Sequence, residues 1–420
     1  MTRASVDLAA QPVRAHLDEF VRTVTGLPAS SPEPVPQLPH ELARLLLRAE
    51  EYEVAHRDQW GNWEYAFGDN FRRGRLWEPE VDVWIAKRRR ELGSRTALQP
   101  LWPNGGDFSI CLTHDVDLVS EAVTPLQALR SARTAWPETG ASRVERVEGV
   151  ARAGVRTARA LGGRLAFAPR ADSLERCIAI EREYEVTASY FFTVFPGAGA
   201  SRFDCVYAPE DACRFRGRRQ TIAEVLQTIS AEGFDVGLHG SYHSSSDDGL
   251  LAREKRALES ATGLALTTTR QHFLRWDIRR TPRLQVSAGF SADATLGFNR
   301  NLGFRSGTAF PSRHFDLDRS QRLDLLLVPL SIHDTPLIRS DGLELDLTLA
   351  CSAVRAVVDA VAATGGVVTF LFHPNNLALP GIEELFRWTI SYGLERRAWF
   401  ASLREVNQWW REREVRLLAR

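Results

Sequence analysis

The chain has 420 residues, 44% of them hydrophobic, so it can bury a sizeable core in one large or two ordinary domains. Its 53 basic and 53 acidic residues cancel, and this balance gives no reason to expect nucleic acid as a partner. The sequence contains no run of about 18 apolar residues that could span a membrane. It also lacks the basic-then-apolar pattern of a secretory signal, so we expect a soluble, cytoplasmic protein.

The first part of the chain predicts a small, mostly helical N-terminal module over residues 1–105. Residues 1–40 show little pattern, and helical periodicity begins at about residue 40. The stretch 58–68 is rich in aromatic and turn-forming residues, and a second helix is expected over 79–92. A Pro- and Gly-rich break then precedes the next apolar run, which marks the boundary of the module.

Apolar strands alternate with helical patterns over the remainder of the chain, residues 106–420. The candidate strands are 108–113, 187–194, 234–239, 268–273, 325–331 and 367–373. The candidate helices are 172–185, 219–232, 248–261, 281–288, 347–364 and 381–392. Alternation of this kind predicts a parallel sheet or a β/α barrel. The long insertion 118–164 holds eight arginines against four glutamates; it is either a pair of solvated helices or a basic flap near an anionic sugar phosphate or a membrane surface.

Two carboxylates follow the first strand of this alternating region. Asp115 and Asp117 stand at i and i+2, so they would point the same way if the strand continued. Acids at the end of a buried strand are costly unless a cation or a reaction uses them. The structural alternative is a helix N-cap or an Asx-turn at the strand end.

Histidines follow a later strand in the same way. His239 and His243 stand at i and i+4, and they would share one face if the strand end turned into a helix. In barrels and open α/β sheets the carboxyl ends of the strands form the active-site edge. Two imidazoles and one carboxylate would hold a zinc ion and leave open positions for water and substrate.

Two further strand ends carry side chains that can do chemistry. His373 ends the last strand and is followed by a proline, so it should face the same rim; its alternative is a bond to a loop carbonyl. Arg270 and Arg275 follow another strand. A buried arginine there would pair with a carboxylate and lower its pKa, whereas a surface ion pair would be worth little.

At these residues the chain resembles the polysaccharide deacetylases with the NodB homology domain, which form carbohydrate esterase family 4. The similar motifs occur in the family's order over 108–373: Thr113–Asp117, Ala188–Phe192, His239–His243, the Arg270 stretch and Leu371–His373. The segment 58–63 is also similar to one that precedes the domain in a bacterial subgroup. The resemblance implies a distorted β/α barrel of the NodB type behind the N-terminal module.

The resemblance also implies an activity, the hydrolysis of an N-acetyl group on an amino sugar of a glycan or glycan precursor. Asp117, His239 and His243 would bind Zn²⁺ or another divalent ion. Asp115 would be the general base, Arg270 would keep it ionised, and His373 would be the general acid that protonates the leaving amine.

Several residues depart from the family pattern. His114 stands where Phe is usual, Val116 where a second Asp is usual, and Gly240 where a hydroxyl residue is common. Gln271 and His272 occupy positions that many members fill with proline and tyrosine, which leaves Arg275 as an alternative partner of the base. Two other functions stay open: hydrolysis of another carbon–nitrogen bond, as in a cyclic imide or ureide, and glycan binding by a decayed site. The sugar and the oligomeric state are not predicted.

Overall fold

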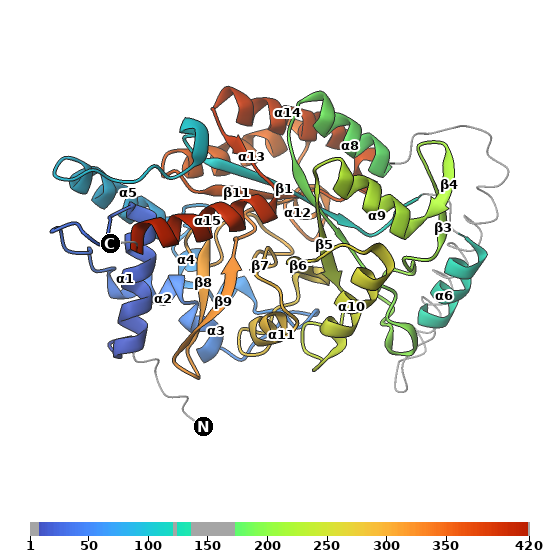
Figure 1. Cartoon of the computed structure of the whole chain (residues 1–420), viewed down its shortest axis with the longest axis horizontal. Coiled ribbons are helices and arrows are strands. Elements are labelled where there is room, and N and C mark those ends of the chain that lie inside the picture. The colour runs from blue at the N-terminus through green and yellow to red at the C-terminus, as the bar shows by residue number, and fades with distance from the viewer. Residues whose placement is uncertain (1–7, 121–123, 136–172, 419–420) are drawn as a thin grey trace.

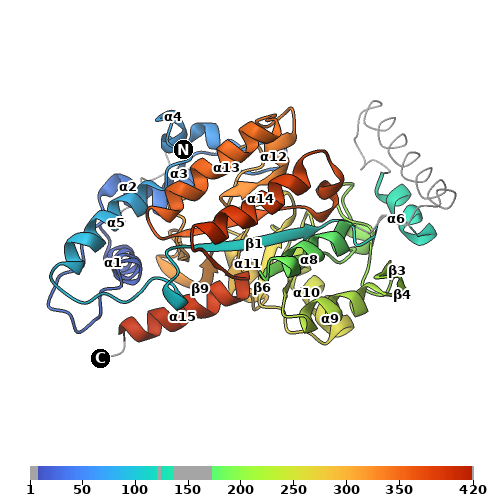
Figure 2. The ribbon, with the colours of Figure 1, turned by 90° about the horizontal axis from the view of Figure 1, so that it is seen from above.

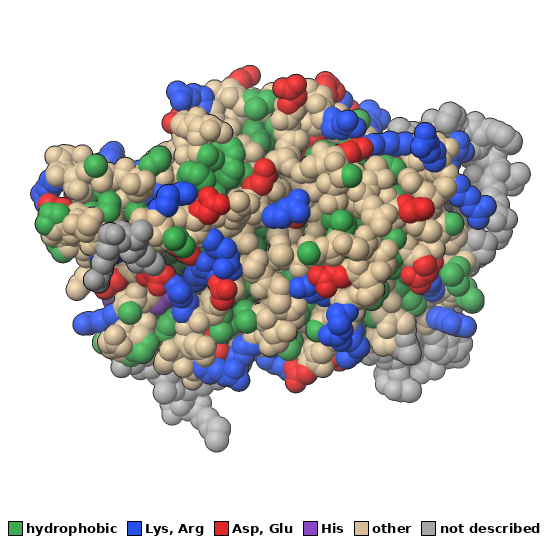
Figure 3. All heavy atoms as spheres, viewed as in Figure 1, with side chains coloured by type: hydrophobic (Ala, Val, Ile, Leu, Met, Phe, Trp, Pro, Cys, Tyr) green, Lys and Arg blue, Asp and Glu red, His purple; other side chains and the backbone are tan. Residues whose placement is uncertain are grey.

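The computed structural model of the protein describes residues 8–120, 124–135 and 173–418 (Figure 1). Most of the basic insertion 118–164 lies outside these residues. None of the helices in the described ranges is both long and apolar enough to cross a membrane. On the face shown in Figure 3, acidic and basic side chains are intermingled, as the balanced charge of the sequence predicts.

A 10-stranded, mostly parallel sheet forms the centre of the molecule, with the order β10-β11-β1-β2-β5-β6-β7-β9-β8 and with β12 paired to β1. Only β8 runs antiparallel to its neighbour, β9. The sheet curls, but no pairing among the described residues joins β8 to β10, so it is a half-barrel. The prediction of a distorted β/α barrel is confirmed. The strands are β1 (Ser109–Val116), β2 (Ala188–Phe192), β5 (Asp235–Gly240), β6 (Thr268–Gln271), β7 (Ala292–Asp293), β8 (Ser312–Asp316), β9 (Gln321–Leu327), β10 (Ile332–His333), β11 (Val367–Leu371) and β12 (Trp399–Phe400).

Strand β1 lies inside the sheet, and every one of its residues is buried. It pairs in parallel with β11 on one side and β2 on the other, with Thr113 opposite Leu371 and Asp115 opposite Phe191. Parallel strands are covered on both faces, which explains the apolar run at residues 108–112, where the strand begins. Because its neighbours run in the same direction, their carboxyl ends meet at one edge.

Helices cover the sheet on both faces. In Figure 2, α13 and α14 lie on one side of β1 and α15 lies on the other. The helices of this part are α6 (Pro125–Ala135), α8 (Ser173–Glu183), α9 (Ile222–Ala231), α10 (Leu250–Thr262), α11 (Thr281–Ser287), α12 (Asp334–Ile338), α13 (Leu347–Ala362), α14 (Ile382–Glu395) and α15 (Leu403–Leu418). The six helices predicted here from the sequence are all present, with shifted ends.

The start of α9 differs from the prediction. The helix expected over 219–232 begins at Ile222, because Thr221 and Glu224 form a reciprocal capping box that satisfies the first free N–H groups. The preceding residues instead form β4 (Arg218–Thr221), which pairs with β3 (Ala212–Phe215) in a separate two-stranded sheet. Arginine and glutamine in this strand give it no apolar run, so it was not predicted.

The N-terminal helices pack on one end of the half-barrel, at the left of Figure 1. They are α1 (Gln11–Thr25), α2 (His40–Leu46), α3 (Ala49–Glu53), α4 (Asp69–Arg72) and α5 (Glu80–Gly93); the first was not predicted from the sequence. Helix α1 contacts α15 and β8. A buried ion pair joins Glu51 to Arg305 at 2.7 Å, and the buried Asp82 accepts hydrogen bonds from Thr308 and from the backbone N–H of Ala309.

Candidate active site

Asp115 and Asp117 lie at the carboxyl end of β1 in different environments. The Asp115 side chain is buried, whereas 32% of the Asp117 side chain is exposed. An Nη1–H group of Arg270 donates to Oδ1 of Asp115 at 3.1 Å. Burial alone would raise the pKa of Asp115, but its electrostatic interactions with His239 and Arg270 outweigh burial and hold the pKa below its ordinary value. Asp115 is therefore a buried, ionised carboxylate at neutral pH.

Arg270, and not Arg275, lies beside Asp115. Arg270 is completely buried in β6, and its Nε–H donates to the carbonyl of Ala294 at 2.9 Å. The guanidinium group of Arg275 instead stacks 3.9 Å above the ring of Tyr242. Of the two arginines that the sequence allows as the partner of Asp115, Arg270 contacts this carboxylate and Arg275 contacts Tyr242 instead.

Three side chains converge so that their possible ligand atoms lie within 4.8 Å of one another: Asp117, His239 and His272. The Nδ1–H of His239 donates to the carbonyl of Arg270 at 3.1 Å. This bond fixes the tautomer and leaves Nε2 as a lone-pair donor. That atom lies 3.8 Å from Oδ1 of Asp117 and 3.7 Å from Oδ2 of Asp115, and it is buried without a hydrogen-bond partner among the described residues. An unpartnered buried nitrogen among carboxylates suits a cation.

His272 completes this group from the turn that follows β6. Its Nε2 lies 3.8 Å from Oδ1 of Asp117, and its Nδ1 lies 3.9 Å from Oδ1 of Asp204. Burial lowers the pKa of His272, but Asp204 and Asp117 outweigh burial and raise it. A carboxylate behind one ring nitrogen is the usual way in which proteins orient a metal-binding histidine. His272 was not predicted as a ligand, although it follows a strand end as the predicted residues do.

His243 is not part of this group. Strand β5 ends at Gly240, and the chain runs through turns until α10 begins at Leu250, so the i, i+4 pair does not share a helical face. The ring of His243 lies against that of Tyr242, with centroids 5.2 Å apart. Gly240 allows this tight turn, because a Cβ there would lie 2.5 Å from Oε1 of Gln271.

His373 follows β11 and faces Asp117 from the other side. Its Nε2 lies 4.0 Å from Oδ2 of Asp117, and its Nδ1–H donates to Oδ1 of Asp334 at 2.8 Å. Asp334 also accepts hydrogen bonds from the His373 backbone N–H and from Asn376. Burial lowers the pKa of His373, but Asp334 outweighs burial and raises it to about 9. Asp334 was not predicted, although it follows the short strand β10.

His333 and His114 belong to two further groups of possible ligands. His333 lies beside His373, with ring centroids 5.5 Å apart, and burial lowers its pKa to about 4. Because Asp334 already holds the protonated His373, this second group is less suited to a cation than the first. His333 is therefore a neutral neighbour of the protonated His373.

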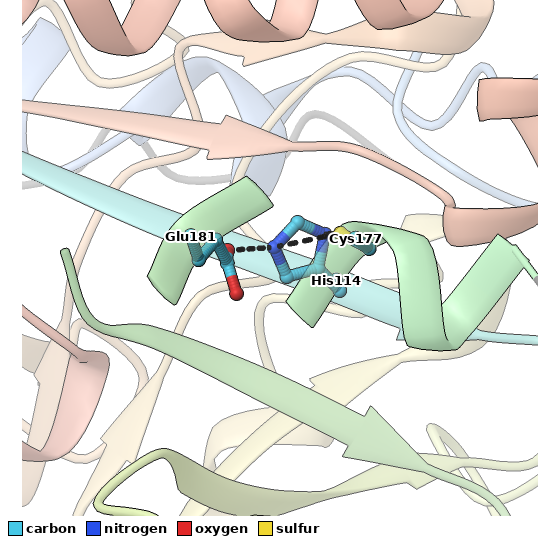
Figure 4. A group of neighbouring side chains, drawn as sticks. All are labelled: His114, Cys177 and Glu181. Carbon is cyan, nitrogen blue, oxygen red and sulfur yellow. Dashed lines mark hydrogen bonds and ion pairs between the residues drawn. The ribbon is translucent and has the colours of Figure 1, made fainter. Parts of the chain in front are cut away.

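The third group consists of His114, Cys177 and Glu181 (Figure 4). Because His114 directly precedes Asp115 in β1, its side chain points to the opposite face of the strand. The Nε2 of His114 lies 2.7 Å from Glu181, and its Nδ1 lies 2.9 Å from the carbonyl of Phe372. Both nitrogens face oxygen acceptors, and the interactions with Cys177 and Glu181 outweigh burial and raise the pKa of His114 well above its ordinary value. His114 is thus an imidazolium in a buried ion pair and offers no lone pair to a metal.

Comparison with known proteins gives similarity at the level of structure. No family model matches the sequence, and no curated protein matches it. Among solved structures, a putative polysaccharide deacetylase from Mycobacterium smegmatis is 19% identical, with a TM-score of 0.49 over 77% of this chain and 96% of that one. A probable polysaccharide deacetylase from Pseudomonas aeruginosa PAO1 and the Puue allantoinase are each 14% identical, with TM-scores of 0.47 over 76% of this chain and 95% of theirs. In the arrangement of its elements the chain is similar to structures of polysaccharide deacetylases, the family that its sequence motifs also resemble.

Proposed function

We propose that the protein is a metal-dependent hydrolase that removes the N-acetyl group from an amino sugar of a glycan or glycan precursor. One observation carries the proposal: the Asp117, His239 and His272 group stands between a buried ionised carboxylate, Asp115, and a protonated histidine, His373. Amide hydrolysis needs these three elements, because water must lose a proton, the carbonyl must be polarised and the amine must gain a proton.

The residues present fit a divalent cation, most simply Zn²⁺. Asp117 would contribute an oxygen, and His239 and His272 would each contribute Nε2, while the Arg270 carbonyl and Asp204 occupy their Nδ1 sides. Three protein ligands leave a position open for water or substrate, as catalytic zinc sites require. When bound, the ion would lower the pKa of water and polarise the acetyl carbonyl.

The proton transfers follow from the two flanking pairs. Asp115 accepts the proton of the attacking water at Oδ2, because Arg270 already occupies Oδ1. His373 carries a proton on Nε2 at neutral pH and donates it to the leaving nitrogen, while Asp334 holds its Nδ1–H. Without this proton the amine is too basic a leaving group. The products are acetate and a free amino sugar.

The test is release of acetate by the zinc-loaded protein from a panel of N-acetylated sugars: chitin oligosaccharides, peptidoglycan fragments and nucleotide-linked N-acetylhexosamines. We expect turnover on at least one member, lost on chelation and restored by zinc. The same preparation is offered allantoin and a cyclic imide. Turnover of these compounds alone would replace the proposal with hydrolysis of another carbon–nitrogen bond. Metal binding without any turnover would favour a glycan-binding protein.

The identity of the third ligand gives a separate prediction. We expect His272→Ala to reduce bound zinc from about one ion per chain to substoichiometric levels, because it removes one of three protein ligands. His243→Ala is the matched control and should keep its zinc. Elemental analysis of both proteins, prepared without a metal-binding tag, measures the difference. If His243→Ala loses its zinc and His272→Ala keeps it, the third ligand is His243, as the sequence spacing predicts, and not His272.

The Asp334–His373 pair predicts a pH effect. His373 must be protonated to act, so kcat/KM should fall as the pH rises through its pKa of about 9. Asp334→Asn removes the negative charge that raises this pKa, and we expect the alkaline limb to move down by about 1 to 3 pH units. Asp341→Asn, which alters an exposed carboxylate paired with Arg339, is the control and should leave the limb unchanged. If the alkaline limb of the pH profile does not move in Asp334→Asn, His373 is not the general acid.

A further inference from the structure

A tight turn in the N-terminal part of the chain, residues 58–63, presents one buried amide toward the turn that carries His272. The carboxylate of Asp58 accepts hydrogen bonds from the backbone N–H groups of Trp60 and Asn62 at 2.9 and 2.8 Å. The Asp58 N–H donates to the carbonyl of Asn62 at 2.8 Å, and Gly61 takes a φ of +84°, which favours glycine. The turn thus holds itself together, and the Asn62 side chain, part of a residue only 4% exposed, is free to bind elsewhere.

The turn that carries His272 needs outside support. Its next two residues, Phe273 and Leu274, have φ values of +55° and +49°, a left-handed conformation that non-glycine residues rarely adopt and that persists only where surroundings enforce it. Two side-chain amides donate to the carbonyl of Phe273, Asn62 at 3.0 Å and Asn299 at 2.8 Å.

Asn62 holds this turn at two points. Its Nδ2 donates to the Phe273 carbonyl, and its Oδ1 accepts the backbone N–H of Trp276 at 2.9 Å. The Phe273 carbonyl can only accept a hydrogen bond and the Trp276 N–H can only donate one. The Nδ2 and Oδ1 ends of the Asn62 amide therefore cannot swap places. The Asn62 side chain therefore spans the residues that immediately follow His272.

We infer that Asn62 is a positioning residue through which the N-terminal part of the chain sets the place of His272 beside Asp117. The inference rests on the proposed metal-binding role of His272. It also gives the turn 58–63 a function: the turn supports a candidate site whose other residues come from the half-barrel. Loosening the Phe273 turn would let the imidazole leave the position from which it can share an ion with Asp117 and His239.

The test compares Asn62→Ala with Asn70→Ala. Asn70 is also 4% exposed, and it also donates from the N-terminal part to a half-barrel carbonyl, that of Phe304 at 3.2 Å, but not to the His272 turn. The readouts are the dissociation constant for Co²⁺, measured by titration of the full chain, and the visible spectrum of the cobalt-loaded protein. We expect Asn62→Ala to weaken binding about 10- to 100-fold, as loss of an outer partner of a ligand does, and Asn70→Ala to change it less than about twofold.

Further outcomes separate this inference from the proposed function. Wild-type affinity in Asn62→Ala, or equal weakening in Asn70→Ala, overturns the role of Asn62 while leaving the deacetylase proposal intact. A wild-type chain that binds no Co²⁺ overturns both. If Asn62→Ala does not fold, Asn62→Asp decides: it keeps the acceptor for Trp276 but loses the donor to Phe273, and wild-type affinity in it would contradict the inference. Asn299→Ala, which removes the other donor to that carbonyl, should weaken binding in the same direction.

Discussion

Replacement of Asp115 by asparagine is expected to lower kcat/KM for acetate release by about 10²- to 10⁴-fold, the usual contribution of a positioned general base. The amide has nearly the same shape as the carboxylate and can still accept the hydrogen bond from Arg270, so the fold should persist. It cannot take a proton from water at neutral pH. Because Asp117, His239 and His272 are untouched, the bound metal should remain.

A buried aspartate at the opposite edge of the sheet provides the control. Asp235 begins β5 and accepts hydrogen bonds from Ser189 and Thr268, at the amino ends of the strands and away from the chemistry. Asp235→Asn should change kcat/KM only a few-fold when measured on folded protein at equal metal content. More than a tenth of wild-type activity in Asp115→Asn, with metal retained, would assign the proton transfer to another group.

The fold was predictable mainly where strands contain apolar stretches. Strands β1, β2, β5 and β11 have such stretches because both of their faces are buried, and β9 has one in its second half, Leu325–Leu327. Strand β6, which reads TTRQ, contains no apolar residue, so this explanation does not apply to it. The pieces that were missed are short or polar. β10 has two residues and β4 is half arginine. Helix α1 was missed although Val13, Leu17, Phe20, Val21 and Val24 recur at helical spacing.

The candidate-site residues that could be predicted are those at the carboxyl ends of parallel strands, where active sites of such sheets form. Asp115, His239, Arg270 and His373 follow buried parallel strands, and the sheet brings them to one edge. The pair His239 and His243 would share a face only if a helix followed β5, but turns follow that strand. His272, just after β6, lies near Asp117 and His239 instead, and we propose it as the third ligand. Partners that act across long sequence distances, such as Asn62 on the His272 turn, leave no local signal.

The largest expected loss of stability comes from the ion pair behind β1. His114→Leu would leave the Glu181 carboxylate completely buried, with the Tyr190 hydroxyl as its remaining partner, and would remove the donor to the Phe372 carbonyl. Breaking a buried pair on one side typically costs about 3–5 kcal/mol of unfolding free energy, which is a large part of the stability of an ordinary domain. Urea denaturation followed by circular dichroism measures this loss.

The double variant His114→Leu/Glu181→Leu should recover most of the lost stability, because apolar side chains need no counter-charge in this place. The control is Arg88→Ala, which breaks an exposed pair with Glu91 and should cost less than about 1 kcal/mol.

The pH dependence of the unfolding free energy has a definite sign. Since the folded pKa of His114 is raised above its unfolded value, the stabilisation is complete below about pH 6.5 and is lost as the pH rises through the folded value. If His114→Leu is as stable as the wild type, β1 and β11 do not need His114 to stay together. If the wild type, but not the double variant, becomes more stable as the pH rises, His114 is neutral in the folded protein.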